Sequence, residues 1–407
     1  MNLIYNLSIY FYSLLIKFYS LFDSKARQWI EGRKFQQLPD LKDKNVIWMH
    51  CSSLGEFEQG KPVFEGLKQK LNKYTFVLTF FSPSGYERLK NNNQIADHIL
   101  YLPIDTPETS NNFFNKINPH ICIFVKYDFW LNYLKLINKH NKNLIFISVL
   151  FSKNHSIFNF FNRPVLKELK KAKKIFTQNL ETTEILERKG FTNVETVGDT
   201  RIDRVLEIAS THYSDEKIEN FISDKKQILI CGSVWEKDIE IISGIKDFLC
   251  KSYKLIIAPH EISEKILNTL LSEFKNFNVQ LYSDYHQTKS EVLIIDKIGL
   301  LSRLYRLGDI AYIGGGFGKG IHNTLEPGAY NLPVIFGPKY NKFIEADTLV
   351  RKNAYFSVKN SEELMNTLLF LADNQNKFEI QNKIKSYFEH NKNASVKIID
   401  YIYKFCC

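Results

Sequence analysis

From Asn45 onward, short runs of apolar residues alternate with longer segments of helical periodicity. Within each run the apolar residues are consecutive, which is typical of strands buried on both faces of a parallel sheet. This alternation predicts right-handed βαβ units and an α/β fold. The predicted strands are 46–50, 76–80, 121–125, 144–149 and 174–178 in the first half, and 227–232, 254–259, 291–296, 309–315 and 333–337 in the second.

The two series of strands are separated by a polar stretch at 205–226, which we interpret as an interdomain linker. A chain of 407 residues suits two domains of about 200 residues each. We therefore expect two Rossmann-like domains facing a cleft, at 31–210 and 211–407. The second domain would include the terminal segment 361–404, whose pattern is helical.

The first residues predict a separate element, an amphipathic helix. At about 100° per residue, its apolar side carries Ile4, Leu7, Phe11, Leu14, Leu15, Phe18 and Phe22, and its polar side carries Asn2, Asn6, Ser13, Lys17, Ser20 and Ser24. We interpret residues 1–30 as a membrane-anchor helix lying in the bilayer interface, with Tyr5, Tyr12 and Tyr19 at headgroup depth. The alternative is that this helix packs on the protein's own body.

The net charge of +10 adds an expectation about partners. A basic protein favours anionic partners such as nucleic acid, anionic lipid headgroups or phosphorylated substrates. The sequence contains no zinc-finger spacing, RNP-type aromatic motif or recognisable helix-turn-helix. We therefore expect an anionic membrane surface and a phosphorylated substrate, and no nucleic acid.

A first candidate for chemistry is the run from His50 to Glu56, between a predicted strand and a predicted helix. Open α/β sheets bind ligands at the loops that follow their strands. A carboxylate in such a loop, beside a glycine that permits close approach, can act as a general base. Glu56 could equally cap the helix, where its charge complements the helix dipole.

Two loops in the second half could hold a nucleotide or phosphate. Five glycines among the residues 314–320 follow a strand and precede a helix, so the backbone amides near Gly315 and Gly316 are candidates for phosphate binding. Glu326, early in the next helix, is placed to accept hydrogen bonds from a ribose. Ser233, directly after another strand, is a candidate helix N-cap that either binds phosphate or only caps.

These motifs together resemble the family of 3-deoxy-D-manno-octulosonic acid (Kdo) transferases. The similarity extends over most of the chain. It rests on four segments in this order: 50–56, 79–85, 102–105 and 314–327. The Ser-x-Gly-Glu run and the His-Asn-Thr-Leu-Glu-Pro run are the most specific of these. The resemblance implies a glycosyltransferase of the GT-B fold, in which two Rossmann-like domains face a cleft.

The resemblance also implies roles for individual residues. Glu56 matches the general base, and Asp128 and Arg201 match the family's transition-state stabilisers. With Ser233, Gly315, Gly316 and His322 from the loops, the positions expected to bind CMP are Pro259, His260, Ile298, Gly299, Leu300, Asn323, Thr324, Leu325 and Glu326. The chain departs from the family pattern at Lys126, at His260-Glu261 and at Leu300.

The activity implied by the resemblance is inverting transfer of Kdo from CMP-Kdo to a lipid A precursor (lipid IVA), in lipopolysaccharide core biosynthesis. The expected location is the cytoplasmic face of the inner membrane, with the chain anchored through its first helix. No cofactor is expected, and we find no Asp-x-Asp motif to hold a metal. One alternative is a GT-B transferase that uses a UDP-sugar on another lipid-linked acceptor, and another is a non-catalytic lipid- or nucleotide-binding protein.

Overall fold

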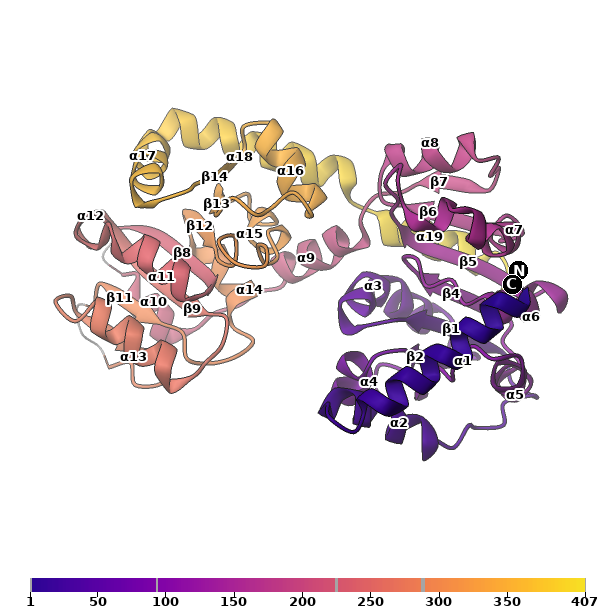
Figure 1. The fold of residues 1–407 in the computed structure, drawn as a ribbon. Helices are drawn as coiled ribbons and strands as arrows, with labels where there is room; N and C mark the ends of the chain where they lie inside the picture. Colours follow the sequence, from indigo (N-terminus) through magenta and orange to yellow (C-terminus); the bar gives the residue numbers. More distant parts are fainter. Residues whose placement is uncertain (1, 93, 224–225, 287–289, 407) are drawn as a thin grey trace. The chain divides into compact units, whose positions relative to one another are not determined.

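In a computed structural model of the chain, the described residues are 2–92, 94–223, 226–286 and 290–406. They form two compact units, one of Met1–Asp203 with Asn391–Cys407 and one of Arg204–His390 (Figure 1). The predicted boundary between residues 210 and 211 therefore differs from the observed one. The stretch 205–226, predicted as a linker, contains the end of one helix and the whole of another.

Unit 1 is built on a parallel sheet of seven strands within the described residues, in the order β3-β2-β1-β4-β5-β6-β7. The strands are β1 (Val46–Cys51), β2 (Thr75–Phe80), β3 (His98–Tyr101), β4 (Ile121–Val125), β5 (Asn143–Val149), β6 (Lys174–Thr177) and β7 (Val194–Thr196). The helices are α1 (Asn2–Tyr19), α2 (Ser24–Lys34), α3 (Leu54–Lys70), α4 (Pro83–Leu89), α5 (Pro107–Ile117), α6 (Leu131–Lys139), α7 (Arg163–Leu169), α8 (Leu180–Arg188) and α19 (Ala394–Tyr403); short 3₁₀ turns lie at Ser156–Phe158 and Phe160–Asn162.

Alternate residues of β1 enter two separate cores, one on each face of the sheet. Trp48 packs with residues of α5 and α6 such as Phe113 and Tyr133. Met49, on the other face, belongs to the core that includes Phe64 of α3. His50 points to the same face as Trp48, and this places a polar ring at the end of the α5–α6 core.

Unit 2 repeats the same architecture with the strand order β10-β11-β9-β8-β12-β13-β14, again parallel throughout. Its strands are β8 (Gln227–Val234), β9 (Tyr253–Pro259), β10 (Val279–Leu281), β11 (Val292–Ile294), β12 (Ile310–Ile313), β13 (Val334–Phe336) and β14 (Tyr355–Ser357). Its helices are α10 (Glu216–Phe221), α11 (Glu236–Ser243), α12 (Lys246–Ser252), α13 (Glu264–Glu273), α14 (Leu301–Leu304), α15 (Leu325–Gly328), α16 (Ile344–Arg351) and α17 (Ser361–Ala372), with a 3₁₀ turn at Tyr305–Leu307. The predicted α/β class with two parallel-sheet domains is confirmed.

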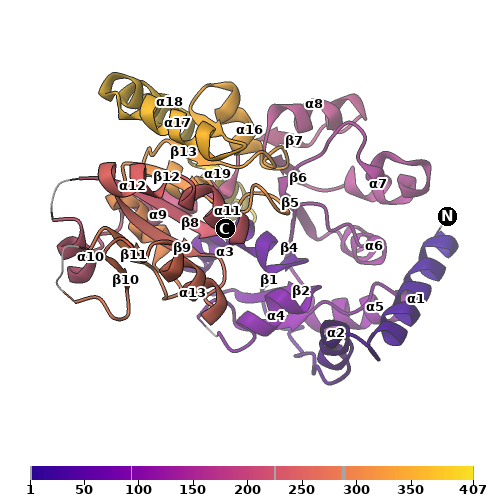
Figure 2. The same ribbon diagram turned by 60° about the vertical axis from the view of Figure 1, so that its left-hand side comes forward.

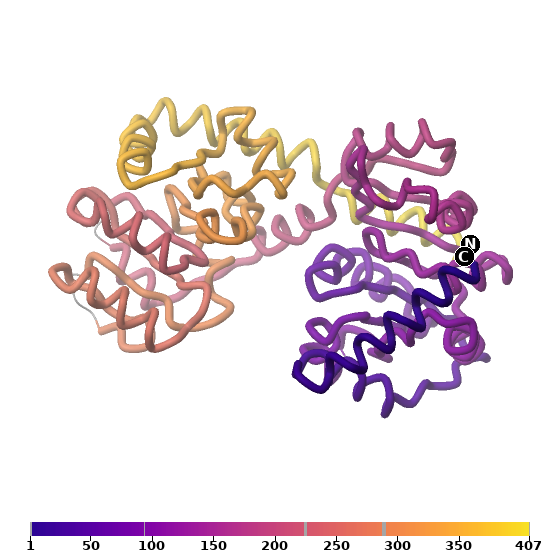
Figure 3. The backbone as a smooth tube through the Cα atoms, viewed as in Figure 1, coloured from indigo at the N-terminus to yellow at the C-terminus, as the bar shows by residue number. Residues whose placement is uncertain are grey.

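Two helices carry the chain between the units, α9 (Thr200–Ser210) and α18 (Asn374–Asn391). After α18 the tail packs on unit 1, as Figure 3 shows for the yellow end of the chain. The carboxylate of Asp203 fixes this return by accepting bonds from the backbone N–H of Asn393 (2.5 Å) and of Ser395 (2.6 Å). Ile399 of α19 then joins the α3 side of the core. The tail therefore belongs to unit 1, not to the second domain as predicted.

The amino-terminal helix α1 runs along the outside of unit 1 from α6 toward α2 (Figures 1 and 2). It is attached through Tyr5, whose hydroxyl donates to the buried carboxylate of Asp105 (2.6 Å) and accepts the backbone N–H of Leu131 (3.1 Å). Asn6 accepts a bond from the side chain of Asn132. A helical segment is thus present as predicted, and one of its faces packs on the body of the protein.

The tyrosines of α1 do not all lie where they were expected. Tyr5 is bonded to Asp105, and Tyr12 packs against Trp29 and Phe81. Tyr5 thus faces the protein, whereas Tyr12 is 39% and Tyr19 59% exposed. The expected headgroup depth stays a prediction. The predicted apolar side points away from unit 1, with Ile4, Leu7, Phe11, Leu14, Leu15, Phe18 and Phe22 exposed.

The length and composition of the helices also bear on membrane insertion. Among the described residues, no helix combines the length and the apolar character needed to cross a bilayer.

We expect the Tyr5–Asp105 bond to stabilise unit 1 measurably. Burial raises the pKa of Asp105 to about 7, although the bonds from Tyr5, Asn132 and Tyr133 oppose this rise. Tyr5→Phe removes one donor and should lower the free energy of unfolding by about 1–3 kcal/mol. Tyr10→Phe is the matched control, because Tyr10 lies on the same helix with 52% of its surface exposed. Equal unfolding midpoints for the two variants in urea would contradict the expectation.

Candidate active site

Two carboxylates meet where β1 and β4 end. Ser53 caps α3, and its Oγ accepts the backbone N–H of Glu56. Ser52 then joins Glu56 to Asp128, which follows β4. The backbone N–H of Ser52 donates to Glu56 Oε2 (2.5 Å), and the hydroxyl of Ser52 donates to Asp128 Oδ2. The structure thus brings together Glu56 and Asp128, two residues predicted from separate motifs.

The surroundings of Glu56 suit a general base. Burial and, to a smaller extent, the charge of Asp128 raise the pKa of Glu56 to about 7, while the N–H of Ser52 and the charge of Lys126 lower it. A carboxyl group with a pKa near neutrality can accept a proton effectively at physiological pH. Glu56 also occupies the first turn of α3, where its charge complements the helix dipole, as the alternative interpretation expected.

His50 begins the run that the sequence singled out for chemistry, but the sequence interpretation gave it no role. It is fully buried, and its Nδ1 lies 2.8 Å from Thr79 Oγ1 while its Nε2 lies 2.8 Å from Asp128 Oδ2. The available signal was a titratable residue at the end of an otherwise apolar strand run. Such a residue is rarely buried without a polar partner.

Arg201 lies in the first turn of α9, and the structure pairs it with Asp199. Its guanidinium donates to that carboxylate through Nε (2.9 Å) and through a terminal nitrogen (2.6 Å). The assignment of Arg201 as a transition-state stabiliser stays a prediction.

In unit 2, four of the residues predicted to bind CMP line one cavity. The cavity has a volume of about 410 Å³, lies beyond the ends of β9 and β11, and is lined in part by Pro259, His260, Ile298 and Gly299. Ile298 is 82% exposed, so an apolar surface is open to a ligand there. Leu300 follows at the start of α14. Residues from two separate loops of the sequence therefore meet at one pocket.

Beside this cavity, three rings form a stack. His260 lies between Trp235 (ring centroids 4.3 Å apart) and His322 (4.2 Å). The indole N–H of Trp235 also donates to His322 Nε2 (2.9 Å). Burial, with a contribution from His260, lowers the pKa of His322 to about 4, so His322 is neutral at pH 7 and carries its proton on Nδ1. Trp235 was not among the predicted site residues; its signal was an aromatic residue directly after a strand.

Ser233 does not cap a helix, contrary to the prediction. It belongs to β8 and has a left-handed φ of 55°. The N-cap of α11 is Trp235, whose backbone N–H is bonded to Asp238 Oδ2 (2.9 Å). The strand continues two residues further than expected, and this moves the helix start beyond Ser233.

The glycine-rich loop after β12 is held largely by its own contacts. The amide of Gly315 donates to Asp238, and the amides of Gly318 and Gly320 donate to Gly315 O. A Cβ on Gly314 would lie 2.2 Å from the carbonyl oxygen of Ser233, so close backbone packing requires glycine there. Within the described residues, the amides of Gly316, Phe317 and Lys319 make no hydrogen bond; Gly316 is buried, whereas Phe317 is half-buried and Lys319 is exposed.

The segment after this loop lies at the start of α15. Asn323 Nδ2 donates to Glu326 Oε1 (3.0 Å), and Asn323 Oδ1 accepts the N–H of Leu325 (3.0 Å). Thr324 is fully buried, and its Oγ1 has no hydrogen-bond partner among the described residues. The Glu326 carboxylate is therefore positioned by Asn323, and its expected bond to a ribose stays a prediction.

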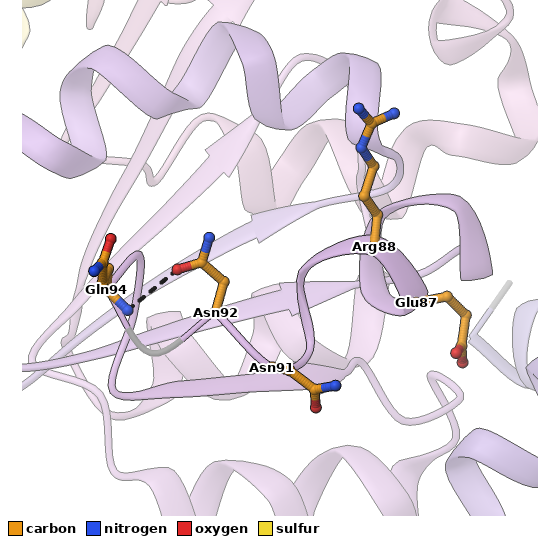
Figure 4. A pocket seen from close by; sticks show the side chains of 5 residues that line it. All are labelled: Glu87, Arg88, Asn91, Asn92 and Gln94. Carbon is orange, nitrogen blue, oxygen red and sulfur yellow. Dashed lines mark hydrogen bonds between the residues drawn. The ribbon is translucent and has the colours of Figure 1, made fainter. Parts of the chain in front are cut away.

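Another cavity lies away from all of these residues. It measures about 490 Å³ at the end of α4 and is lined by Glu87, Arg88, Asn91, Asn92 and Gln94 (Figure 4). None of its side chains is a predicted site residue. The ends of β1 and β4, where the carboxylates meet, stay the candidate for the chemistry.

The raised pKa of Glu56 predicts a pH-dependent effect on stability. The folded protein binds this proton more tightly than the unfolded chain, so Glu56 contributes stability below about pH 4.5 that is lost as pH rises through about 7. Glu56→Gln removes this loss. The change in the free energy of unfolding from wild type to this variant should therefore be more favourable at pH 8 than at pH 5, by an amount on the order of 1–3 kcal/mol. The exposed Glu58→Gln on the same helix is the control. An equal effect of Glu56→Gln at both pH values would count against the raised pKa.

Comparison with known proteins agrees with the motifs. Residues 28–204 match the family model of 3-deoxy-D-manno-octulosonic-acid transferase (kdotransferase). The chain is 28% identical to a bifunctional glycosyltransferase/methyltransferase of Fusobacterium nucleatum, over 92% of this chain but only 60% of that protein. It is 28% identical to the 3-deoxy-D-manno-octulosonic acid transferase of Aquifex aeolicus (86% of this chain, 93% of that one) and 23% identical to that of Rickettsia prowazekii (88% and 78%).

Solved structures with the same fold are also found. MnaA of S. aureus, determined with UDP, aligns with a TM-score of 0.59 at 12% identity, over 89% of this chain and 97% of its own. MurG of Acinetobacter baumannii aligns with a TM-score of 0.56 at 11% identity, over 89% of this chain and 99% of its own. The resemblance drawn from the motifs is thus confirmed: the Kdo transferase family model matches residues 28–204, and proteins named as Kdo transferases are similar to this chain over most of its length.

Proposed function

We propose that this protein transfers Kdo from CMP-Kdo to a phosphorylated lipid A precursor, lipid IVA, in lipopolysaccharide core biosynthesis. The observation that carries the proposal is the pair of carboxylates, Glu56 and Asp128, bridged by Ser52 inside the domain that matches the Kdo transferase family. A base with a pKa near 7 beside a second acidic group suits the activation of a sugar hydroxyl.

The reaction proposed for Glu56 is an inverting displacement at the anomeric carbon of Kdo. Glu56 removes the proton from the acceptor hydroxyl, whose oxygen forms the new bond as the bond to the CMP phosphate breaks. The transition state has oxocarbenium character, and the charge of Asp128 suits its stabilisation. In unit 2, the free amides of the glycine-rich loop are suited to the phosphate of CMP.

The cavity of unit 2 supports a nucleotide donor. Its exposed Ile298 and the ring of His260 offer apolar and stacking surface to a base or ribose. Neutral His322 carries an Nδ1–H that can donate a hydrogen bond. These features favour binding of a nucleotide sugar without selecting cytidine over uridine, so the donor has to be tested directly.

The test is transfer by the purified protein from CMP-Kdo to a tetra-acyl disaccharide bisphosphate, with the lipid product identified by mass spectrometry. Wild type and Glu58→Gln should produce a lipid heavier by Kdo. Glu56→Gln should be slower by a factor on the order of 10²–10⁴, since the amide keeps the shape but cannot accept a proton. Transfer from a UDP-sugar but not from CMP-Kdo would favour the alternative transferase, and undiminished turnover by Glu56→Gln would remove Glu56 as the base.

We also propose that unit 1 docks on the cytoplasmic face of the inner membrane through α1. The exposed side of this helix includes Leu7 (58% exposed), Phe11 (61%) and Phe18 (65%), and an apolar surface of this kind is suited to the interfacial region of a bilayer. The polar contacts of Tyr5 hold the helix to the protein, so its apolar side stays directed outward.

A basic pocket beside the start of α1 supports an anionic membrane as the partner. It measures about 420 Å³ and is lined by Asn2, Lys135, Arg163, Pro164, Lys167 and Glu168. Glu168 is already paired with Lys171 (2.8 Å), whereas the described residues provide no ion-pair partner for Lys135, Arg163 or Lys167. Three cations that form no ion pair among the described residues, next to an apolar helix, match a phosphate-bearing headgroup.

We expect a triple variant, in which Gln replaces Lys135, Arg163 and Lys167, to lose the preference of the protein for anionic vesicles. Each cation near an anionic surface contributes about 1 kcal/mol, so binding to phosphatidylglycerol vesicles should fall on the order of ten- to a hundredfold, while weak binding to phosphatidylcholine vesicles persists. The control replaces Lys44, Lys68 and Lys73, which do not line the pocket, by Gln. A co-sedimentation assay decides the matter, and equal losses in the two triple variants would contradict a role for the pocket.

A further inference from the structure

We propose that His50 is a positioning residue for the transfer reaction. In its neutral form, with the proton on Nε2, His50 holds Asp128 in place beside Glu56. The inference rests on the proposed function and extends it to a residue outside the predicted site. It stands on a continuous chain of hydrogen bonds that runs from Trp48 through Thr79 and His50 to Asp128.

The first part of the chain fixes the direction of the Thr79 hydroxyl. The parallel register places Thr79 of β2 beside His50 of β1, and both side chains are fully buried. The indole N–H of Trp48 can only donate, so at 2.9 Å it makes Thr79 Oγ1 an acceptor. The hydroxyl proton then goes to His50 Nδ1 at 2.8 Å, because the other acceptor, Met49 O, is 3.5 Å away.

The second part fixes the proton of His50. If Nδ1 accepts from Thr79, the neutral ring carries its proton on Nε2, which lies 2.8 Å from Asp128 Oδ2. The opposite tautomer would place two acceptors, Nε2 and the carboxylate, 2.8 Å apart. In that tautomer, Nε2 would accept only the weaker bond from the indole N–H of Trp130, at 3.3 Å. The shorter, charge-assisted bond to Asp128 prevails.

The third part links this bond to the base. Asp128 Oδ2 also accepts the hydroxyl of Ser52, and the N–H of the same serine donates to Glu56. A shift of Asp128 would therefore disturb Ser52 and reduce the part of the Glu56 pKa rise that the Asp128 charge adds to the effect of burial. The other charged or titratable groups that face Glu56 are Lys126, whose charge opposes the rise, and Cys51 and Tyr127, whose own pKa values are raised by burial and then by Glu56.

The test compares Thr79→Val with Thr79→Ser. Valine removes the hydroxyl that orients His50, and serine keeps it. Thr79→Val should lower kcat for Kdo transfer on the order of 10- to 100-fold, while Thr79→Ser stays near wild type. Release of Asp128 lowers the pKa of Glu56, so the acid limb of the pH–kcat profile should move to lower pH in Thr79→Val. A lower plateau with the limb unmoved would mean a purely structural role and would overturn the proposal.

A second readout is the protonation of the ring nitrogens, measured by NMR on protein labelled with ¹⁵N-histidine. The signals that disappear in His50→Gln identify His50. Wild type and Thr79→Ser should show a protonated Nε2 and an unprotonated Nδ1, and a protonated Nδ1 would overturn the proposal even if Thr79→Val fails to fold. The nitrogen shifts do not depend on the donor sugar, so failure of this inference and failure of the proposed function are distinguishable.

Discussion

The parallel pairing of β1 with β2 and β4 is the constraint on which the carboxylate site depends. Pairing His50 with both Thr79 and Phe124 brings the carboxyl ends of the three strands to one level, where Ser52 and Asp128 follow. A slip of one residue would turn every side chain of a strand to the other face. His50 would then lie in the apolar core on the α3 side, without its polar partners. The apolar residues that fix the register thus also fix the positions of the polar ones.

All ten strands predicted from apolar runs are present, with boundaries that differ by a few residues at most. The four strands that were not predicted, β3, β7, β10 and β14, are the four edges of the two sheets. An edge strand has one neighbour and a partly solvated surface, so it lacks a long apolar run; β10, for example, has no fully buried residue. The periodicity of a sequence reports burial, and it is therefore weakest where a strand is least buried.

The site was predictable as far as local motifs reach. Glu56 and the loop residues around Pro259 and Ile298 follow strands, and the position after a strand can be read from the sequence. The partners of these residues could not be read in this way. His50 meets Asp128 from 78 positions away, and Trp235 meets His322 across 87. Similarly, the α1 pattern shows an apolar side but not that Tyr5 would find a buried carboxylate 100 positions on.

The return of the tail to unit 1 has a consequence for the order of events during synthesis. Unit 2 occupies one continuous stretch of chain, whereas unit 1 needs α19 from beyond it. Unit 2 can therefore complete its core first, while the α3 side of unit 1 waits with Phe57 and Phe64 lacking the cover of Ile398 and Ile399. The half of the protein that carries Glu56 would therefore complete its core only after the whole chain has been synthesised.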